Sequence, residues 1–307
     1  MKLLIVKLSA LGDVVHAMDA VKQVPHTEIH WVIEKPFAPL VEDIASKVYV
    51  AETKKWRKNP FKYLSEIRAF IQRLSQEKYD IVIDLQGNIK SSLVLPFVQA
   101  PRKVGFSKQA VPEKVNLLFT NERYTPTPGQ NIREDYLELL EKAIGFKGSF
   151  TAEVPKKLVE KILVCPGSAW ENKKLSTEQL VQFLKLYGDK EFSVLWGNES
   201  ERVQAEALAS RLAKAKVLPK LSLDQLKGVM LKHDLVVAMD SFPLHYAAYL
   251  GLATYSFFGP SSGSKYAPVG PSHTHIQGSC PYGKSFNKRC PVLRSCPTGA
   301  CLKDLKF

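Results

Sequence analysis

Residues 2–24, KLLIVKLSALGDVVHAMDAVKQV, decide the fold class of this chain. Residues 2–8 form an apolar run rich in Leu, Ile and Val, as expected of a buried parallel strand. Residues 9–13 favour a turn, and residues 14–24 can form a helix that Pro25 stops. A strand, a tight turn and a helix in this order are typical of an α/β domain.

The same alternation continues along the first half of the chain. A second strand is predicted at 29–33, and a third at 79–85, ending at Gln86 and Gly87. Between them, the apolar residues at positions 61, 64, 67, 71 and 74 recur at helical spacing and predict an amphipathic helix. Strands that alternate with helices form a parallel sheet through crossover connections.

The pattern restarts in the second half. Strands are predicted at 161–165, 192–196, 235–239 and 254–258, with helices at 177–187, 199–213 and 244–250. We therefore expect an α/β protein of two doubly wound domains, 1–150 and 151–307, with a boundary near 147–160 that includes Pro155. In such sheets ligands bind beyond the carboxyl ends of the strands, so the turns there are where chemistry is expected.

The chain is strongly basic. Its 307 residues carry 43 Lys and Arg against 30 Asp and Glu, which gives a net charge of +13 and a pI near 9.4. Such a surface attracts polyanions: a nucleic acid, an anionic membrane face or a phosphorylated substrate. Part of the excess lies in the cluster Lys54, Lys55, Arg57 and Lys58, and part in the tail, which includes Arg294.

Membrane-spanning and secretory segments are not evident. No apolar run approaches the roughly 18–20 residues that span a bilayer. The first apolar run is interrupted by Lys7 and Asp13, too early for a signal peptide. A cytoplasmic location is the default expectation.

The turn at 9–13 lies between a strand and a helix. A helix N-terminus presents free N–H groups and partial positive charge, which suits an anion. The simpler interpretation is that Asp13 caps that helix. The motif G-x-G-x-x-G is absent and Gly12 stands alone, which argues against a nicotinamide cofactor.

Polar residues also follow two strands of the second half. Ser168, with Lys173 and Lys174 shortly after it, supplies a hydroxyl and two cations that can hold a diphosphate. The full phosphate loop is missing, so an ATPase is not supported. Glu199 comes just past a strand end, where a carboxylate can accept hydrogen bonds from ribose hydroxyls, or where it simply favours the helix dipole.

A third strand end reads Asp240-Ser241-Phe242-Pro243-Leu244-His245. Asp or Ser can cap the following helix, and the first-turn N–H groups can face a phosphate. Pro243 removes one donor but fits a first-turn position. A lone His245 is more often structural than catalytic.

The tail holds four of the five cysteines, which are Cys280, Cys290, Cys296 and Cys301. Their spacing contains no C-x-x-C pair and fits no zinc pattern well. A cytoplasmic location disfavours stable disulfides. A bound metal, disulfide pairs and reduced structural thiols all stay open.

Taken in order, these segments resemble the ADP-heptose:lipopolysaccharide heptosyltransferases, glycosyltransferase family 9, along nearly the whole chain. The matching stretches are KLSALGDVVH at 7–16, WVIE at 31–34, DIVIDLQGNIKS at 80–91, PGS at 166–168, WGNE at 196–199, the pair at 240–241 with His245, and FGP at 258–260. The basic cluster at 54–58 looks most like that of heptosyltransferase I, which adds the first heptose to Kdo of the inner core. The cysteine tail also resembles one seen in many members.

The resemblance implies a GT-B fold, with two Rossmann-like domains facing a cleft. The first domain would hold the acceptor and the second the ADP-sugar donor. The implied reaction is an inverting transfer without a metal or other cofactor, in which an acceptor hydroxyl displaces ADP. The implied acceptor is an anionic Kdo-lipid A on the cytoplasmic face of the inner membrane. This anionic surface would account for the basic charge without a nucleic acid, and the protein would be peripheral there.

Residue roles carry over where the motifs match. Asp13 matches the general base. The donor-binding matches are Ser168 and Lys173 for the diphosphate, Glu199 for the nucleoside, and Asp240, Ser241 and His245 for the loop beside the diphosphate. On the acceptor side the resemblance implies Ser9, Gly12, Lys54, Lys55, Arg57, Lys58, Gln86 and Lys90.

Three departures from the family pattern fall on the donor side. Residues 241–243, Ser-Phe-Pro, stand where Thr-Gly usually follows the Asp, so a bulky side chain and a missing N–H alter the phosphate nest. Residues 173–175, Lys-Lys-Leu, replace the usual Lys-x-Trp. Residues 261–263, Ser-Ser-Gly, stand where Thr-Asp-Pro is common.

Three alternatives remain. The nearest is another family 9 transferase, such as heptosyltransferase II or one with a different nucleotide-sugar donor. A nucleotide-dependent oxidoreductase is opposed by the missing G-x-G-x-x-G motif. A non-catalytic polyanion-binding protein is opposed by the presence of Asp13.

Overall fold

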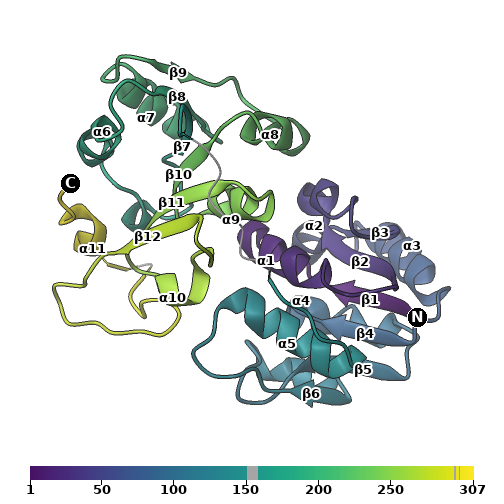
Figure 1. Ribbon diagram of the computed structural model, residues 1–307. Coiled ribbons are helices and arrows are strands. Elements are labelled where there is room, and N and C mark those ends of the chain that lie inside the picture. The colour runs from purple at the N-terminus through teal and green to yellow at the C-terminus, as the bar shows by residue number, and fades with distance from the viewer. Residues whose placement is uncertain (151–157, 294, 297) are drawn as a thin grey trace. The chain divides into compact units, whose positions relative to one another are not determined.

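The computed structural model describes residues 1–150, 158–293, 295–296 and 298–307. Pro155 and Arg294, which the sequence singles out, lie outside these residues. The chain forms two compact units, one of residues 1–128 and 132–150, the other of residues 129–131 and the described residues from 158 onward. Within the described residues each unit contains one six-stranded, all-parallel sheet flanked by helices (Figure 1). The α/β fold class is confirmed.

The sheet of the first unit has the order β3-β2-β1-β4-β5-β6. Its strands are β1 (Lys2–Val6), β2 (Glu28–Glu34), β3 (Lys47–Ala51), β4 (Ile81–Asp84), β5 (Arg102–Phe106) and β6 (Glu122–Tyr124). In register, Leu4 of β1 stands between His30 of β2 and Val82 of β4. The chain turns from one side of β1 to the other after β3, so the carboxyl ends of β1 and β4 form the switch point where ligands bind in such sheets.

Helices cover both faces of this sheet. The longer ones are α1 (Leu11–Val21), α3 (Leu64–Ser75) and α5 (Ile132–Ile144), and the shorter ones are α2 (Thr53–Lys58), α4 (Ile89–Ser92) and the 3-10 turns η1 (Lys35–Leu40), η2 (Leu95–Phe97) and η3 (Lys114–Leu118). Phe70 and Leu74 of α3 pack with Leu4 of β1 in one buried cluster. α1 packs against α5 instead, beside the sheet in Figure 1.

Two helix predictions in this unit need correction. The amphipathic helix begins at Leu64 rather than 61, and Phe61 and Leu64 are 88% and 41% exposed, so neither belongs to its buried face. The preceding residues form a turn, in which the Asn59 side chain accepts a hydrogen bond from Lys62 N at 3.2 Å. The first helix begins at Leu11, three residues earlier than predicted.

The second unit repeats the architecture with the order β12-β11-β10-β7-β8-β9. Its strands are β7 (Lys161–Cys165), β8 (Glu191–Val194), β9 (Ala215–Val217), β10 (Leu235–Met239), β11 (Ala253–Phe258) and β12 (His273–Gln277). Its helices are α6 (Thr177–Lys185), α7 (Glu199–Ala209), α8 (Leu223–Met230), α9 (Phe242–Tyr249), α10 (Gly263–Tyr266), α11 (Ala300–Lys303) and the 3-10 turn η4 (Glu171–Lys173). The switch point lies between β7 and β10, which are neighbours.

The C-terminal tail is part of this unit's core. Gln179 of α6 donates from Nε2 to the carbonyls of Leu302, Lys303 and Leu305 at 2.8–3.0 Å. The Phe307 ring packs edge-on against Phe183, with 5.3 Å between centroids. These contacts fix the end of the chain on α6 and bring the cysteine-containing segment against the sheet.

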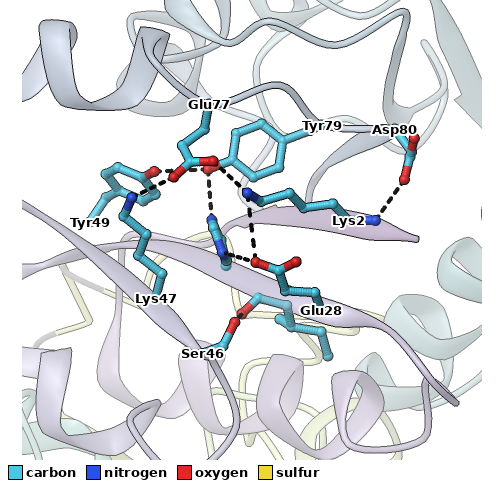
Figure 2. A network of polar contacts seen from close by, with 10 residues as sticks. Lys2, Glu28, Ser46, Lys47, Tyr49, Glu77, Tyr79 and Asp80 are labelled. Carbon is cyan, nitrogen blue, oxygen red and sulfur yellow. Dashed lines mark hydrogen bonds and ion pairs between the residues drawn. The ribbon is translucent and has the colours of Figure 1, made fainter.

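A polar network closes the amino ends of β1 to β3, away from the switch point (Figure 2). Glu77 is bound by Lys2 of β1 and by Lys47 of β3, the latter at 2.6 Å, and these two hydrogen bonds lower its pKa to about 2. In the same network, Tyr79 hydrogen-bonds to His30 and donates to Tyr49 at 3.0 Å. Because ligands bind at the opposite edge, we assign this network to stability.

Candidate active site

The first unit brings three of the predicted acceptor residues together. The Gln86 Oε1 accepts hydrogen bonds from Leu8 N at 3.1 Å and Ser9 N at 3.0 Å. The Nζ of Lys90 lies 3.4 Å from the Ser9 hydroxyl. Ser9, Gln86 and Lys90 therefore meet at the carboxyl ends of β1 and β4, the switch point of this sheet.

A buried carboxylate that the sequence reasoning missed shapes this loop. Asp84 is fully buried, and its Oδ1 accepts hydrogen bonds from Gln86 N at 2.8 Å and Gly87 N at 3.0 Å. Its Oδ2 accepts one from Asn116 Nδ2 at 2.6 Å. Burial raises the pKa of Asp84 despite these bonds. An Asp at the end of an otherwise apolar strand is the sequence signal that could have identified it.

Asp13 does not cap its helix. The N-cap of α1 is Ala10, which has no side-chain cap, and Asp13 is the third helical residue. Its side chain is half-buried, in the same turn as Gly12. In this first turn the helix dipole stabilises negative charge, so the structure replaces the capping interpretation with a carboxylate beside the switch point.

The basic cluster divides into two kinds of residue. Lys54, Lys55 and Lys58 line a hollow of about 460 Å³, together with Glu34, Lys35, Pro36, Glu52, Asn59, Lys62 and Tyr63. Lys55 is engaged within it, since its Nζ lies 2.8 Å from Glu66, and this contact raises the pKa of Lys55. Arg57 is exposed and is not among the residues that line the hollow.

The hollow adjoins the switch point. Glu34, which lines it, ends β2 and donates from its backbone N to Leu8 O at 3.2 Å. The Thr53 hydroxyl of α2 donates to the Glu34 carboxylate. The cations of α2 thus lie next to the turn that carries Ser9 and Asp13.

In the second unit, Asp240 is the centre of the predicted donor site. It follows β10 and is about nine-tenths buried, and its Oδ2 accepts hydrogen bonds from Lys173 at 2.5 Å and from the Ser261 hydroxyl. The His245 Nε2 lies 3.3 Å from its Oδ1, and Ser168 lies 3.5 Å from its backbone oxygen. Three strand ends and two helices, five separate segments, therefore supply one polar cluster.

The residues that contact Asp240 stabilise its negative charge. Burial acts to raise the pKa of Asp240, but the contacts with His245 and Lys173 outweigh it and hold that pKa well below its usual range. Lys173 is thereby a buried cation, whereas Lys174 pairs with Glu171 at 2.5 Å, a carboxylate that is 89% exposed. Ser261, which was noted in the sequence only as part of a departure, is a member of the site.

The loop after Asp240 leads directly into α9. α9 begins at Phe242, with Ser241 as its N-cap and Pro243 in the first turn. The Phe242 ring stacks on Tyr246 at 5.3 Å and 17°, and Tyr246 stacks on Tyr249 at 6.2 Å. The Ser241 hydroxyl donates to Met239 O at 3.3 Å. An aromatic stack thus borders the N-terminus of α9.

Glu199 is not part of the Asp240 cluster in this structure. Its carboxylate is 70% exposed and accepts a hydrogen bond from Arg202 Nε at 2.8 Å, which lowers the pKa of Glu199. Glu201, which sequence reasoning missed, instead accepts a hydrogen bond from Gly197 N at 2.8 Å and lies against Gly167. The spacing Asn198-x-x-Glu201 resembles a capping box and is the signal that could have singled it out.

The four tail cysteines line one hollow of about 350 Å³. All are free thiols here; hydrogen bonds from Gly299 N and Thr298 lower the pKa of Cys296, while burial raises that of Cys301 to about 11. Across the described part of the chain, no three His, Cys, Asp or Glu side chains are grouped so that they could hold a metal ion. No helix in those same ranges has the length and apolar content needed to cross a membrane.

Comparison with known proteins extends over both units. A family model described as glycosyltransferase family 9 (heptosyltransferase) matches residues 67–295. Lipopolysaccharide heptosyltransferase 1 of Pseudomonas aeruginosa is 29% identical over 94% of this chain and 87% of its own length. The Escherichia coli heptosyltransferase WaaC with ADP superposes with a TM-score of 0.82 at 26% identity, covering 91% of this chain and 94% of that one. The same enzyme with ADP-2-deoxy-2-fluoro heptose, at the same coverage, gives 0.80 at 27% identity.

Proposed function

The chain belongs to glycosyltransferase family 9 and has a GT-B fold of two Rossmann-like domains, and from this premise we propose that it transfers heptose from ADP-heptose to Kdo of the lipopolysaccharide inner core. The relatives named lipopolysaccharide heptosyltransferase 1 support the reaction class and a lipopolysaccharide acceptor. The similarity to WaaC bound to an ADP-heptose analogue supports the donor.

The observation that carries this proposal is the buried Lys173–Asp240 pair at the switch point of the second sheet. A diphosphate leaving group gains negative charge as its bond to the sugar breaks. A cation that is already fixed in place stabilises that charge without reorganisation. In the proposed role, Lys173 and the first amides of α9 hold the diphosphate, while Ser168, Ser241 and His245 border it, and Glu199 binds the ribose.

The acceptor side supplies the base. A hydroxyl of Kdo attacks the anomeric carbon of heptose from the face opposite ADP, and its proton passes to the Asp13 carboxylate. The carbon–oxygen bond to the diphosphate breaks, and ADP leaves with the bonding electrons. The configuration inverts once, and no metal or other cofactor takes part in this scheme.

The remaining predicted residues hold the acceptor in this scheme. Residues 1–150 form the acceptor domain and residues 151–307 the donor domain. Ser9, Gly12, Gln86 and Lys90 surround the sugar, and the cluster Lys54, Lys55, Arg57 and Lys58 meets the acceptor's carboxylates and phosphates. The protein works at the cytoplasmic face of the inner membrane as a peripheral protein, and its positive charge is used there rather than on nucleic acid.

A second candidate is another family 9 transferase, either heptosyltransferase II or an enzyme with a different nucleotide sugar. One observation favours keeping it: Phe242 and Pro243 change the first turn of α9, beside the proposed diphosphate position. The missing N–H and the stacked ring alter the donors that a diphosphate would meet.

The test is a reconstituted transfer measured by mass spectrometry. The purified protein is offered ADP-heptose, ADP-glucose and UDP-sugars, each with Kdo-lipid A or with its once-heptosylated form. We expect a heptose adduct on Kdo-lipid A only. An adduct on the heptosylated acceptor alone would support the type II alternative, and no adduct with ADP-heptose would reject the proposed donor.

A further inference from the structure

Five large apolar side chains stand exposed on α4, the residue after it, η2 and η3 of the first unit. The exposed fractions are Ile89 55%, Leu93 65%, Phe97 40%, Val115 39% and Leu118 80%. Single exposed apolar residues are normal on a protein surface, but a contiguous group of them marks an interaction site. We call this group the α4–η3 face.

The first three residues lie on one side of a nearly continuous helical segment. Ile89, Leu93 and Phe97 are spaced four residues apart, which places them in line. The other side of the same segment is buried: Ser91 is 0% exposed and Leu95 is 0% exposed. The segment therefore exposes a row of large apolar side chains to solvent, in addition to the apolar and small polar residues that it buries.

Val115 and Leu118 extend the same face. η3 is joined to α4 by Asn116, whose Nδ2 donates to Ser92 Oγ at 3.1 Å, and by Glu113, whose carboxylate accepts from Ile89 N at 2.9 Å. Asn116 is fully buried between the two segments. Val115, which precedes it, and Leu118, two residues later, remain exposed beside α4.

Cations accompany the apolar residues. Lys90 lies on α4, and Lys114 is an exposed residue at the start of η3. The Arg123 guanidinium donates to Leu117 O at 2.5 Å, which places it next to Leu118. Three cations thus border these apolar side chains, against one carboxylate, Glu113, that is held by Ile89 N. Apolar side chains with an excess of Lys and Arg beside them are typical of surfaces that lie in the headgroup region of anionic bilayers.

We propose that the α4–η3 face docks this protein on an anionic lipid bilayer, with Ile89, Leu93, Phe97, Val115 and Leu118 entering the interfacial region. The inference rests on the proposed function, because a Kdo-lipid A acceptor is itself anchored in such a bilayer. α4 begins directly after the loop that positions Gln86 against Ser9. Docking by this face therefore brings the proposed acceptor site to the height of the lipid headgroups.

The test measures binding to vesicles of phosphatidylethanolamine and phosphatidylglycerol by co-sedimentation. The variant is Leu93→Ser/Leu118→Ser. Its matched control is Leu186→Ser/Leu231→Ser, two leucines of the second unit that are 70% and 54% exposed. We expect the Leu93/Leu118 variant to bind vesicles about tenfold more weakly than the parent protein, and the control to bind as the parent does.

Two further measurements separate docking from catalysis. With a soluble Kdo acceptor that lacks acyl chains, the Leu93/Leu118 variant should release ADP at the parent rate, whereas with acceptor embedded in vesicles it should be slower. If the parent protein is inactive on both acceptors yet binds vesicles through this face, the proposed function fails and docking stands. Docking would be overturned if both variants sedimented equally with vesicles. It would also be overturned if the parent protein formed a dimer in solution that the Leu93/Leu118 substitutions dissociate and the control substitutions do not.

Discussion

The Nζ of Lys173 lies 2.5 Å from the Oδ2 of Asp240, although 67 residues separate them and both side chains are about nine-tenths buried. The pair joins η4 to the end of β10 across the switch point of the second sheet. A buried lysine of this kind costs desolvation energy unless a partner compensates for it. Asp240 is that partner, and it keeps a cation where the proposed diphosphate needs one.

The first prediction concerns this cation. Lys173→Ala should weaken ADP and ADP-heptose binding together, by about 10–100-fold, since both ligands share the diphosphate and a charge-assisted hydrogen bond contributes about 1.5–3 kcal/mol. Isothermal titration calorimetry measures both affinities. Because the variant leaves the Asp240 carboxylate buried without its lysine, Lys173→Ala/Asp240→Asn is measured beside it to keep the fold intact.

Lys174→Ala is the matched control for that experiment. Lys174 is adjacent in sequence but pairs with the exposed Glu171, so ADP affinity should stay near the parent value. Equal losses for the two lysines, or no loss for either, would place the diphosphate elsewhere.

The second prediction separates Glu199 from Glu201, two of the three glutamates of α7. If Glu199 releases Arg202 and binds the ribose, the parent protein should prefer ADP over 2′-deoxy-ADP, and Glu199→Ala should remove that preference. Glu201→Gln should retain the preference, because Glu201 is already engaged with Gly197 N. Competition titrations give the affinities of the three proteins for both nucleotides, and a preference lost only in the Glu201 variant would assign the ribose to Glu201.

The third prediction concerns the hollow beside α2. Lys54→Ala/Lys58→Ala should raise the acceptor KM and flatten its dependence on salt, since two cations that line the hollow are removed. Donor affinity should be unchanged. Lys232→Ala, an exposed lysine of the second unit, is the control. Unchanged acceptor kinetics at low salt would reject the hollow as the acceptor site.

The fourth prediction uses the network of Figure 2. The pKa of Glu77 is lowered from 4.5 to about 2 in the folded protein, so its stabilising contribution is present above about pH 4.5 and is lost as the pH falls towards 2. Glu77→Gln should therefore lower the Tm at neutral pH, and the difference from the parent protein should shrink below pH 4.5. Glu42→Gln, at an exposed position of the same unit, should show no such trend.

Much of the sheet could be predicted because its central strands are short apolar runs. The strand predicted at 235–239 has the observed bounds of β10, and all five of its residues are buried. By contrast, β3 and β6 lie at the sheet edges and carry half-buried or exposed residues, so their patterns are weak. At the edge strands a real element has a weak pattern, whereas at Phe61 the helical pattern extends beyond the real helix. Phe61 has the right spacing, but it lies outside the helix and is exposed.

The candidate site was harder to predict, because sequence gives strand ends but not side-chain directions. The residues following β7, β10 and β11 were expected at one edge of a sheet, and Ser168, Asp240 and Ser261 do meet there. The local sequence distinguishes Glu199 from Glu201 by the capping-box-like spacing of Asn198 and Glu201, but it does not show which way either side chain turns. Only the structure shows that one turns towards Arg202 and the other towards Gly197.

The last prediction tests Asp13 as the base. A sugar hydroxyl is a poor nucleophile at neutral pH, and removal of its proton during attack typically contributes about 10²–10⁴-fold. Asn has nearly the same shape but cannot accept that proton, so Asp13→Asn should lower kcat by about this factor and leave ADP affinity unchanged. Because Asp13 is the third residue of α1 and not its N-cap, the loss of its charge removes a helix-dipole interaction of about 0.3–1 kcal/mol, while the Asn side chain keeps an oxygen that accepts hydrogen bonds, so the Tm should fall little. Asp19 lies on α1 as well, and Asp19→Asn breaks its ion pair with Arg133 of α5. This variant should show the reverse pattern, a lower Tm with turnover retained. Near-normal turnover of Asp13→Asn would remove Asp13 as the base, and unfolding of that variant would assign it a structural role instead.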